Sequence, residues 1–358
     1  MKKSLIALAV LAASGAAMAQ SSVTLFGVVD TGFGYVKNSG TKGIGLEGQK
    51  NYGMSSNGNV NSRLGFRGVE DLGGGLKAGF WLESQLFPDD GNPAGISFQR
   101  RSTISLMGGF GEVRMGRDLT AGYVKTSTYD VFGQVGMGMF RGWSNGVAAA
   151  DGDFNGYRAS NMLAYYTPNF GGFTAAVNYG FGESVNGGSK AGRYVGGYAA
   201  YDNGPLSVAL AMDKNNGALA ALSSSDVDRT QVSLGGSYDL GMAKITGLVQ
   251  RVEMESNLVA GNEVKYNNWM LGVSAPVGPG TIKAQYASYD QKDSQDEAQQ
   301  FSIGYVYDMS KRTAVYGTAA FMKNKNNAKV ALGGAGLALA PAAGKSQNGF
   351  QVGVRHAF

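Results

Sequence analysis

Among the residues of this 358-residue chain that could do chemistry is a run of oxygen ligands, the hexapeptide DGDFNG at residues 151–156. Its spacing matches the first half of an EF-hand loop, in which carboxylate and amide oxygens bind Ca²⁺. The twelfth position is Met162, where an EF-hand has a bidentate Glu, and the flanking residues do not predict helices. A polar turn is the favoured interpretation, and the sequence leaves open whether this segment binds calcium.

Catalytic motifs are weaker still. The tetrapeptide VDTG at residues 29–32 is similar to an aspartic-protease active-site turn, but such a site needs paired carboxylates and the chain has no second Asp-Thr-Gly. His356 is the single histidine, so a serine nucleophile would have no other imidazole as its base. The chain also has no cysteine and no phosphate-binding loop of the Gly-x-x-x-x-Gly-Lys-Ser/Thr type. We therefore expect no catalytic residue, no metal site and no cofactor.

Fixed charges offer a different chemistry, the sorting of ions. Acidic side chains gather at and within residues 118–157, at Asp118, Asp130, Asp151 and Asp153. The same stretch carries Lys125 and Arg141. Basic side chains stand earlier in the chain, at Arg63, Arg67 and Arg101. Charges of opposite sign on facing surfaces can decide which ions pass between them.

The elements that would position these charges follow an export signal. Lys2 and Lys3 form a positive region, residues 5–11 an apolar run too short to span a bilayer, and AMA at residues 17–19 a cleavage site of small residues. We expect residues 1–19 to be a signal peptide and residues 20–358 to form one mature domain. Removing Lys2 and Lys3 lowers the formal net charge from +5 to +3. An excess this mild predicts no nucleic-acid partner.

The mature chain has no apolar run of the roughly 18 residues that a membrane helix needs. A closed barrel is the other structure that pairs every backbone group inside a membrane. A total of 57 Gly, 18 Tyr and 17 Phe fits many strands with bends and aromatic girdles. The last strand has one face formed by Phe350, Val352, Val354, His356 and Phe358. This parity predicts that His356 lies on the lipid side, near the periplasmic interface.

Alternating segments predict about sixteen strands. They lie near residues 23–35, 62–71, 76–87, 100–107, 112–118, 158–167, 173–181, 193–201, 206–213, 230–239, 243–253, 266–277, 281–290, 301–308, 313–323 and 347–358. Long polar connections, at residues 36–61, 88–99, 119–157, 182–192, 214–229, 254–265, 291–300 and 324–346, alternate with short turns. Short periplasmic turns and long outer loops are typical of outer-membrane barrels.

Alternation alone does not distinguish a barrel from a soluble sandwich, whose polar face would look outward to water. The export signal, the terminal Phe and the asymmetry of the connections favour the barrel. We predict an all-β fold, a transmembrane antiparallel β-barrel in the cell outer membrane, with both termini facing the periplasm.

Four blocks of the mature chain carry a family resemblance: SVTLFGVVD at residues 22–30, SRLGFRGVEDLGGGL at 62–76, GGFGEVRMGR at 108–117 and VRHAF at 354–358. In this order they resemble the general porins of Gram-negative outer membranes, especially the betaproteobacterial type. The resemblance implies a homotrimer of sixteen-stranded barrels, each with its third outer loop folded into the lumen. It also implies that Phe358 is read by the barrel-assembly machinery, and that the barrel lies among outer-membrane lipids, including lipopolysaccharide.

The resemblance makes residues 119–157 the constriction loop. A connection of about 39 residues is far longer than most hairpin loops and is normally functional. If Leu64 and Phe66 face lipid, Arg63 and Arg67 turn inward. If Ile104 and Leu106 face lipid, Arg101 turns inward as well. Arg63 and Arg67 also match the family's wall position for pore arginines. We expect these three to face the loop carboxylates across the narrowest section, with Arg114 and Arg141 as weaker candidates.

The predicted function is that of a general diffusion porin, not an enzyme: a water-filled channel for passive flux of ions and small polar solutes, weakly selective for anions. Two alternatives remain open. One is a porin specific for a particular small anion or sugar, which would show saturable, solute-blocked conductance. The other is a surface receptor or adhesin that acts through its outer loops and would tolerate a plugged pore.

Overall fold

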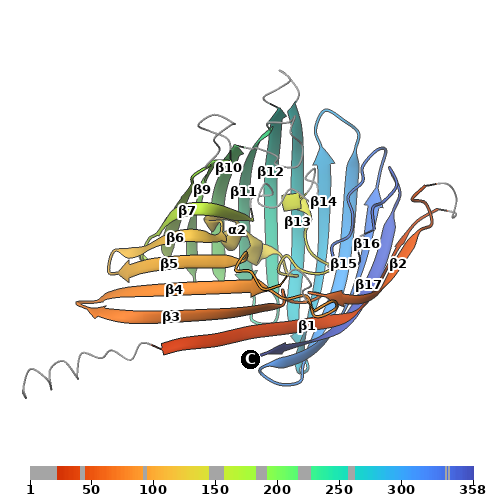
Figure 1. Cartoon of the computed structure of the whole chain (residues 1–358). Helices are drawn as coiled ribbons and strands as arrows, with labels where there is room; N and C mark the ends of the chain where they lie inside the picture. Colours follow the sequence, from red (N-terminus) through yellow and green to blue (C-terminus); the bar gives the residue numbers. More distant parts are fainter. Residues whose placement is uncertain are drawn as a thin grey trace, which may run out of the picture.

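The computed structural model describes residues 22–40, 45–91, 95–144, 157–182, 192–216, 227–256, 263–334, 337 and 339–358. In this part of the chain the strands form one antiparallel barrel (Figure 1). The strands are β1 Ser22–Asn38, β2 Lys50–Ser56, β3 Arg63–Gly73, β4 Leu76–Gln85, β5 Arg101–Gly108, β6 Gly111–Leu119, β7 Arg158–Tyr166, β8 Phe173–Gly180, β9 Tyr194–Asn203, β10 Leu206–Asn216, β11 Val227–Asp239, β12 Lys244–Ser256, β13 Glu263–Val277, β14 Gly280–Gln291, β15 Glu297–Asp308, β16 Thr313–Asn324 and β17 Gln347–Ala357. The helices are α2 Ala121–Thr126, η1 Ser127–Tyr129 and η2 Gly142–Ser144.

β2 and β3 share one position in the barrel. β1 pairs along one edge with β17, and along the other edge with both β2 and β3. Thr31 lies opposite Ser56 in β2, and Val28 lies opposite Arg63 in β3. The seventeen strands of the described residues therefore fill sixteen positions, which confirms the predicted transmembrane barrel of about sixteen strands.

The sequence does not predict β2. Residues 36–61 are expected to form one long loop, and this expectation is wrong because Lys50–Ser56 pairs with the loop end of β1. The segment is short and polar, and only Tyr52 and Met54 mark its outer face, at 60% and 58% exposure. So short a run with two apolar positions gives a weak alternation signal.

Asp30 fixes the link between β2 and β3. Its carboxylate accepts hydrogen bonds from the backbone N–H groups of Asn59 at 2.8 Å and Val60 at 2.6 Å, and from the Tyr316 hydroxyl at 2.6 Å. Asp30 itself is fully buried. A carboxylate saturated in this way serves the fold, which accounts for the protease-like tetrapeptide around it.

The barrel is apolar outside and polar inside. On β10 and β11 the outward Leu210 and Leu234 are half exposed, whereas the inward Gln231 and Ser233 are buried. An apolar outer face around a fully paired backbone is what a lipid bilayer requires. No helix in the described residues is long and apolar enough to cross a membrane.

The last residue closes the barrel. Phe358 donates its backbone N–H to the Gly27 carbonyl at 3.0 Å, and Gly27 donates back to the Phe358 carbonyl at 3.1 Å. Its ring lies against Gly27, where a side chain would collide with it. His356 is exposed and lies within 2.8 Å of the Thr313 hydroxyl through its Nδ1 atom. The exposed position of His356 matches the predicted lipid-side parity.

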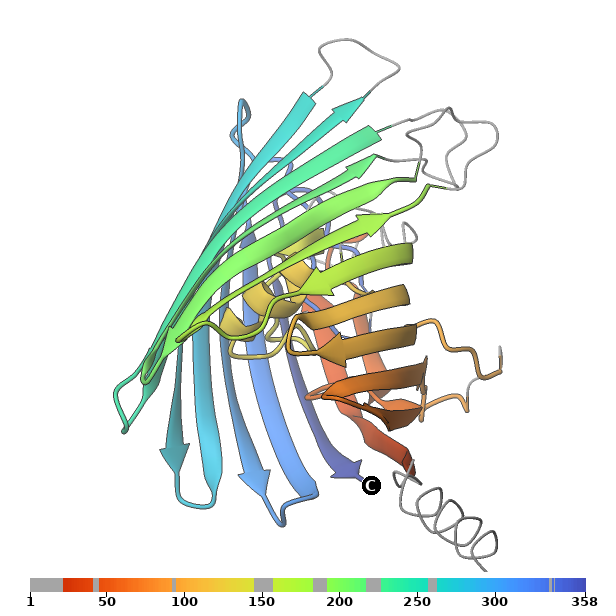
Figure 2. The ribbon, with the colours of Figure 1, turned by 90° about the vertical axis from the view of Figure 1, so that its left-hand side faces the viewer.

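The connection after β6 turns into the barrel, as Figure 2 shows for α2 and the coil that follows it. The fully buried loop residues Met137, Phe140 and Trp143 pack in one cluster with the wall residues Met270 and Tyr289. The Phe140 and Tyr289 rings stack with their centroids 5.5 Å apart. An apolar core therefore lies inside the barrel along the loop, which is the inward-folded third loop that the family resemblance implies.

Candidate pore constriction

Polar side chains from several strands of the barrel form hydrogen bonds with the backbone of the third loop. They point inward from β8, β11, β13, β14, β15 and β17, and they are Asn178, Arg229, Asn268, Gln285, Gln300 and Gln351. Gln300, for example, donates to the Met137 and Met139 carbonyls at 3.2 Å each. Since buried backbone groups need partners, this row fixes the path of the loop across the lumen.

Asp130 lies within this loop and is 3% exposed. Its carboxylate accepts backbone hydrogen bonds from Phe132 at 3.0 Å, Gln134 at 2.9 Å and Phe140 at 3.1 Å. Burial raises the pKa of the Asp130 carboxyl above its ordinary value, and these hydrogen bonds partly oppose the rise. The structure therefore places Asp130 at the centre of the loop's own turn and not among the wall arginines.

The other candidates from the loop lie elsewhere. Lys125 forms an ion pair with Asp202 at 2.6 Å, and the Arg141 backbone N–H donates to the Tyr289 hydroxyl at 2.9 Å. Asp151 and Asp153 fall outside the described residues, as does the whole calcium-loop-like hexapeptide at residues 151–156.

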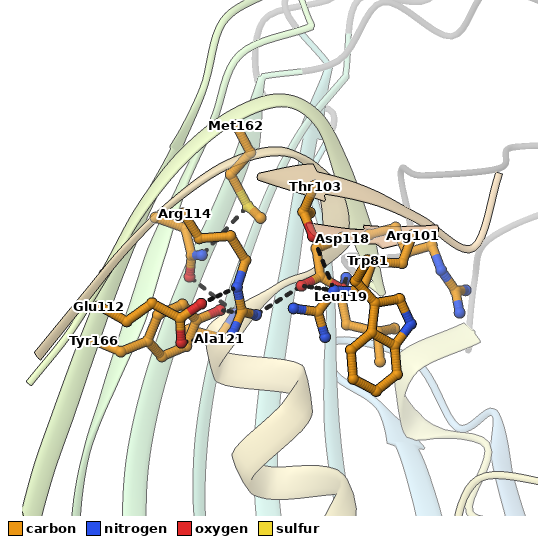
Figure 3. Close-up of polar contacts among 12 residues, drawn as sticks. Trp81, Arg101, Thr103, Glu112, Arg114, Asp118, Leu119, Ala121, Met162 and Tyr166 are labelled. Atoms are coloured by element: carbon orange, nitrogen blue, oxygen red, sulfur yellow. Dashed lines mark hydrogen bonds and ion pairs between the residues drawn. The ribbon is translucent and has the colours of Figure 1, made fainter. Parts of the chain in front are cut away.

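A row of charged side chains lines the near wall, on β5 and β6, beside Tyr166 of β7 (Figure 3). The Asp118 carboxylate lies 3.3 Å from Arg101 Nε and 2.7 Å from Arg114 Nη1. Arg114 also donates to both carboxylate oxygens of Glu112, at 2.9 and 3.0 Å, and its guanidinium lies over the Tyr166 ring. Asp118 thus belongs to the wall with the arginines and does not face them from the loop.

Arg67 continues this row onto β3, with different partners. Its guanidinium carbon lies 5.2 Å from the centre of the Phe26 ring and 5.1 Å from the centre of the Trp81 ring. On the opposite side of β4, Arg101 lies 4.5 Å from the centre of the same Trp81 ring. The structure therefore brings Arg67 and Arg101 together through an aromatic side chain.

A second row stands closer to the long loops, around Glu83. Arg100 donates to the Glu83 carboxylate at 2.6 Å and to Gln85 at 2.6 Å, and Arg63 Nε lies 3.9 Å from Glu83. Arg158 donates to the Arg100 carbonyl at 2.9 Å. A cavity of about 330 Å³ adjoins this row, lined by Asn57, Gln85, Phe87, Gln99, Arg100, Arg117, Tyr157 and Arg158.

Four charged residues of the two rows are not predicted from the sequence. Glu83 shares its parity with Trp81, and Glu112 shares its parity with Arg114, so strand alternation could have found both. Arg100 and Arg158 stand at loop–strand junctions, where a period of two assigns no face.

The two rows carry a positive excess. They bring together six guanidinium groups, from Arg63, Arg67, Arg100, Arg101, Arg114 and Arg158, and three carboxylates, from Glu83, Glu112 and Asp118. In the described part of the third loop, residues 119–144, Asp130 is the one acidic residue, and it is buried. The near wall of the lumen therefore has a net positive charge that the described loop does not neutralise.

Comparison with known proteins decides the family. A family model for Gram-negative porins matches residues 5–327. The chain belongs to the Gram-negative porins. Outer membrane porin protein 32 of Delftia acidovorans is 52% identical over 362 residues, covering 100% of both chains. An outer membrane porin protein of Bordetella pertussis is 33% identical, covering 90% of this chain and 95% of the relative.

Solved structures place the porin in the same fold. The anion-selective porin from Comamonas acidovorans aligns with a TM-score of 0.87 and 48% sequence identity, covering 95% of this porin and 100% of that chain. This porin is therefore a β-barrel channel of the outer membrane, through which ions and small hydrophilic solutes pass.

Proposed function

We propose that this porin is a general diffusion channel that passes anions somewhat more readily than cations. The observation that carries the proposal is the excess of guanidinium groups over carboxylates on the near wall. Charges that line a confined section of a channel determine which ions enter it. Because Glu83, Glu112 and Asp118 compensate half of the arginines, the expected preference is weak.

Exposure of the charges to water supports this reading. Arg63 and Arg101 keep 30% and 20% of their side-chain surface open. Unit charges 4 Å apart interact by about 1 kcal/mol in water and by about 4 kcal/mol at an effective dielectric constant near 20. Arginines beside the narrow path of an ion therefore outweigh charges on the distant outer surface. The porin from Comamonas acidovorans is described as anion-selective, which agrees with this sign.

The proposal includes four parts that rest on the family resemblance and on the sequence. The porin is exported by a cleaved signal peptide at residues 1–19, inserted by the barrel-assembly machinery through Phe358, and embedded as a homotrimer among lipids that include lipopolysaccharide. It acts as a passive channel and not as an enzyme. The family and the fold, which are those of a channel, support this last part.

The zero-current potential across a salt gradient tests the proposed selectivity. For purified porin in a planar bilayer with dilute potassium chloride, the sign of the zero-current potential should show that chloride passes more readily than potassium. The potential should shrink at molar salt, where the Debye length falls to about 3 Å. A preference for potassium over chloride, or a potential that does not change with ionic strength, would contradict the proposal.

A further inference from the structure

Arg67 differs from the other arginines of the wall in how it is held. Arg63, Arg100, Arg101 and Arg114 each lie within 4 Å of a carboxylate oxygen. Among the described residues Arg67 forms no ion pair and no hydrogen bond, and its contacts are the Phe26 and Trp81 rings. It is also exposed. An aromatic partner keeps a guanidinium in place without neutralising its charge or occupying its N–H donors.

The two rings form a corner. Phe26 and Trp81 meet edge to face, with centroids 5.0 Å apart and an angle of 64° between their planes. Arg67 lies within about the same distance of both ring centres, at 5.2 and 5.1 Å. One side of its guanidinium is therefore covered by rings, while its exposed side faces the water of the lumen.

Other residues hold the corner in this shape. Trp81 donates its indole N–H to Glu83 at 3.2 Å and carries Arg101 on its ring at 4.5 Å. Phe26 lies directly over Gly65, where even a methyl group would overlap its ring. The rings are therefore fixed before any solute arrives, which reduces the entropy that binding costs.

The chemistry of the corner selects a class of solute. A guanidinium presents a planar fork of donors that fits a carboxylate in a bidentate manner. Aromatic rings at the side of that fork favour a flat apolar body, which can pack edge to face or offset against them. We propose that Phe26, Arg67 and Trp81 form a binding subsite for aromatic carboxylates in the channel. This inference rests on the proposed function, since the solute must first enter an anion-passing lumen.

The subsite lies between the second row and the short-turn end of the barrel. In the register of the wall, Arg67 pairs with Thr24 and Trp81, whereas Arg63 pairs with Val28 and Gln85 further toward the long loops. An aromatic carboxylate that crosses the channel from the long-loop side therefore meets the second row first and the corner next. Binding there should slow its passage and obstruct chloride.

Block of the chloride current by benzoate tests the subsite. In planar bilayers, benzoate should reduce the chloride conductance of the wild type in a saturable manner. Cyclohexanecarboxylate, which has the same charge and a similar size but no flat ring, should need about a tenfold higher concentration for the same block. Equal block by the two acids, or no saturation up to the solubility limit, would overturn the inference.

Three variants locate the site. Arg67→Lys keeps the charge and removes the planar fork, and Trp81→Leu removes a ring. Gly65→Ala places a methyl group against the Phe26 ring and the Leu82 backbone carbonyl, and so displaces Phe26. Each should raise the half-blocking benzoate concentration by about tenfold. The matched controls are Arg251→Lys, on an exposed arginine of β12, and Gly53→Ala, at a site with open space. Benzoate should block both control variants at the same concentration as the wild type. Retained block in Arg67→Lys would overturn the assignment.

The chloride preference without benzoate is measured on the same channels. If the wild type prefers chloride but benzoate does not discriminate, the subsite is wrong and the proposed function stands. If the wild type shows no preference for chloride, the proposed function fails at that step, and with it the inference. Far-UV circular dichroism and heat dissociation of each variant confirm that the barrel has folded.

Discussion

Arg101 and Asp118 form an ion pair on a single wall of the barrel, with 3.3 Å between Nε and Oδ2. The same carboxylate oxygen lies 2.7 Å from Arg114. One acid therefore restrains two arginines and offsets part of their charge. The acidic residue in the described part of the third loop, Asp130, is buried. The electric field in the lumen therefore depends on the net charge that remains on the wall after its carboxylates offset its arginines.

Removing this acid should strengthen the anion preference. Asp118→Asn keeps the shape of the side chain and releases one positive charge, so we expect the ratio of chloride to potassium permeability to rise by about twofold. The zero-current potential in dilute salt measures this ratio. Asp290→Asn, which removes a β14 carboxylate from an exposed pair with Lys292, is the matched control. An unchanged or lower ratio in Asp118→Asn would show that this acid does not shape the field.

Asp130 should make the third loop sensitive to pH. Burial raises its pKa above 3.8, so the closed loop binds this proton more tightly than an opened loop does. The stabilisation from the proton is complete below pH 3.8 and is lost as the pH rises through the raised pKa. Intrinsic hydrogen exchange itself depends on pH, so each rate is divided by the rate of an unstructured peptide at the same pH. This corrected exchange rate of the segment 130–140 should therefore rise as the pH rises from about 3.5 to about 7.

The variant Asp130→Asn carries no titrating group at this position and should abolish that pH dependence. Asp290→Asn serves again as the control, and its segment 130–140 should behave as in the wild type. The explanation is wrong if Asp130→Asn retains the full pH dependence of the wild type.

Asp30 should be needed for the stability of the barrel. In Asp30→Ala the backbone N–H groups of Asn59 and Val60 and the Tyr316 hydroxyl lose their acceptor. Each buried polar group left without a partner costs about 1–3 kcal/mol. The temperature of heat denaturation, followed by circular dichroism, should fall clearly in this variant. Asp71→Ala, at the exposed end of β3, should change it little. Equal melting of the two variants would remove the role given to Asp30.

Deletion of Phe358 should lower insertion into the outer membrane while leaving export intact. The deleted residue pairs its backbone with Gly27 of β1 where β1 and β17 close the barrel, and it supplies the terminal aromatic side chain. Phe358→Trp keeps both features and should insert as the wild type does. The measurement is the amount of porin in the outer-membrane and periplasmic fractions. Normal outer-membrane levels of the truncated porin would contradict the prediction.

The strands of this barrel could be predicted because lipid outside and water inside impose a period of two on each of them. β13, for example, alternates between the exposed Trp269 and Leu271 and the buried Asn268 and Met270. β2 could not be predicted in this way, since a strand of seven residues with two outward apolar side chains differs little from a polar loop. The path of the third loop also depends on contacts with distant strands that no local pattern contains.

The candidate site could be predicted in part. Strand parity brings Arg63, Arg67 and Arg101 to one wall, where the structure places them. The burial of Asp130 could not be inferred, because it results from the loop folding around its own carboxylate. The stacking of Arg67 on two rings depends on the register between β1, β3 and β4, which the sequence alone does not supply.

The role of the wall arginines in selectivity is tested by the zero-current potential of the wild type and of the triple variant Arg63→Ala, Arg67→Ala, Arg101→Ala. In a tenfold gradient of dilute potassium chloride, the wild type should show a chloride preference. The triple variant, in which three carboxylates face the three remaining arginines of the two rows, should lose most of that preference. A wild type that prefers potassium, or a triple variant with the potential of the wild type, would contradict the selectivity role of these arginines.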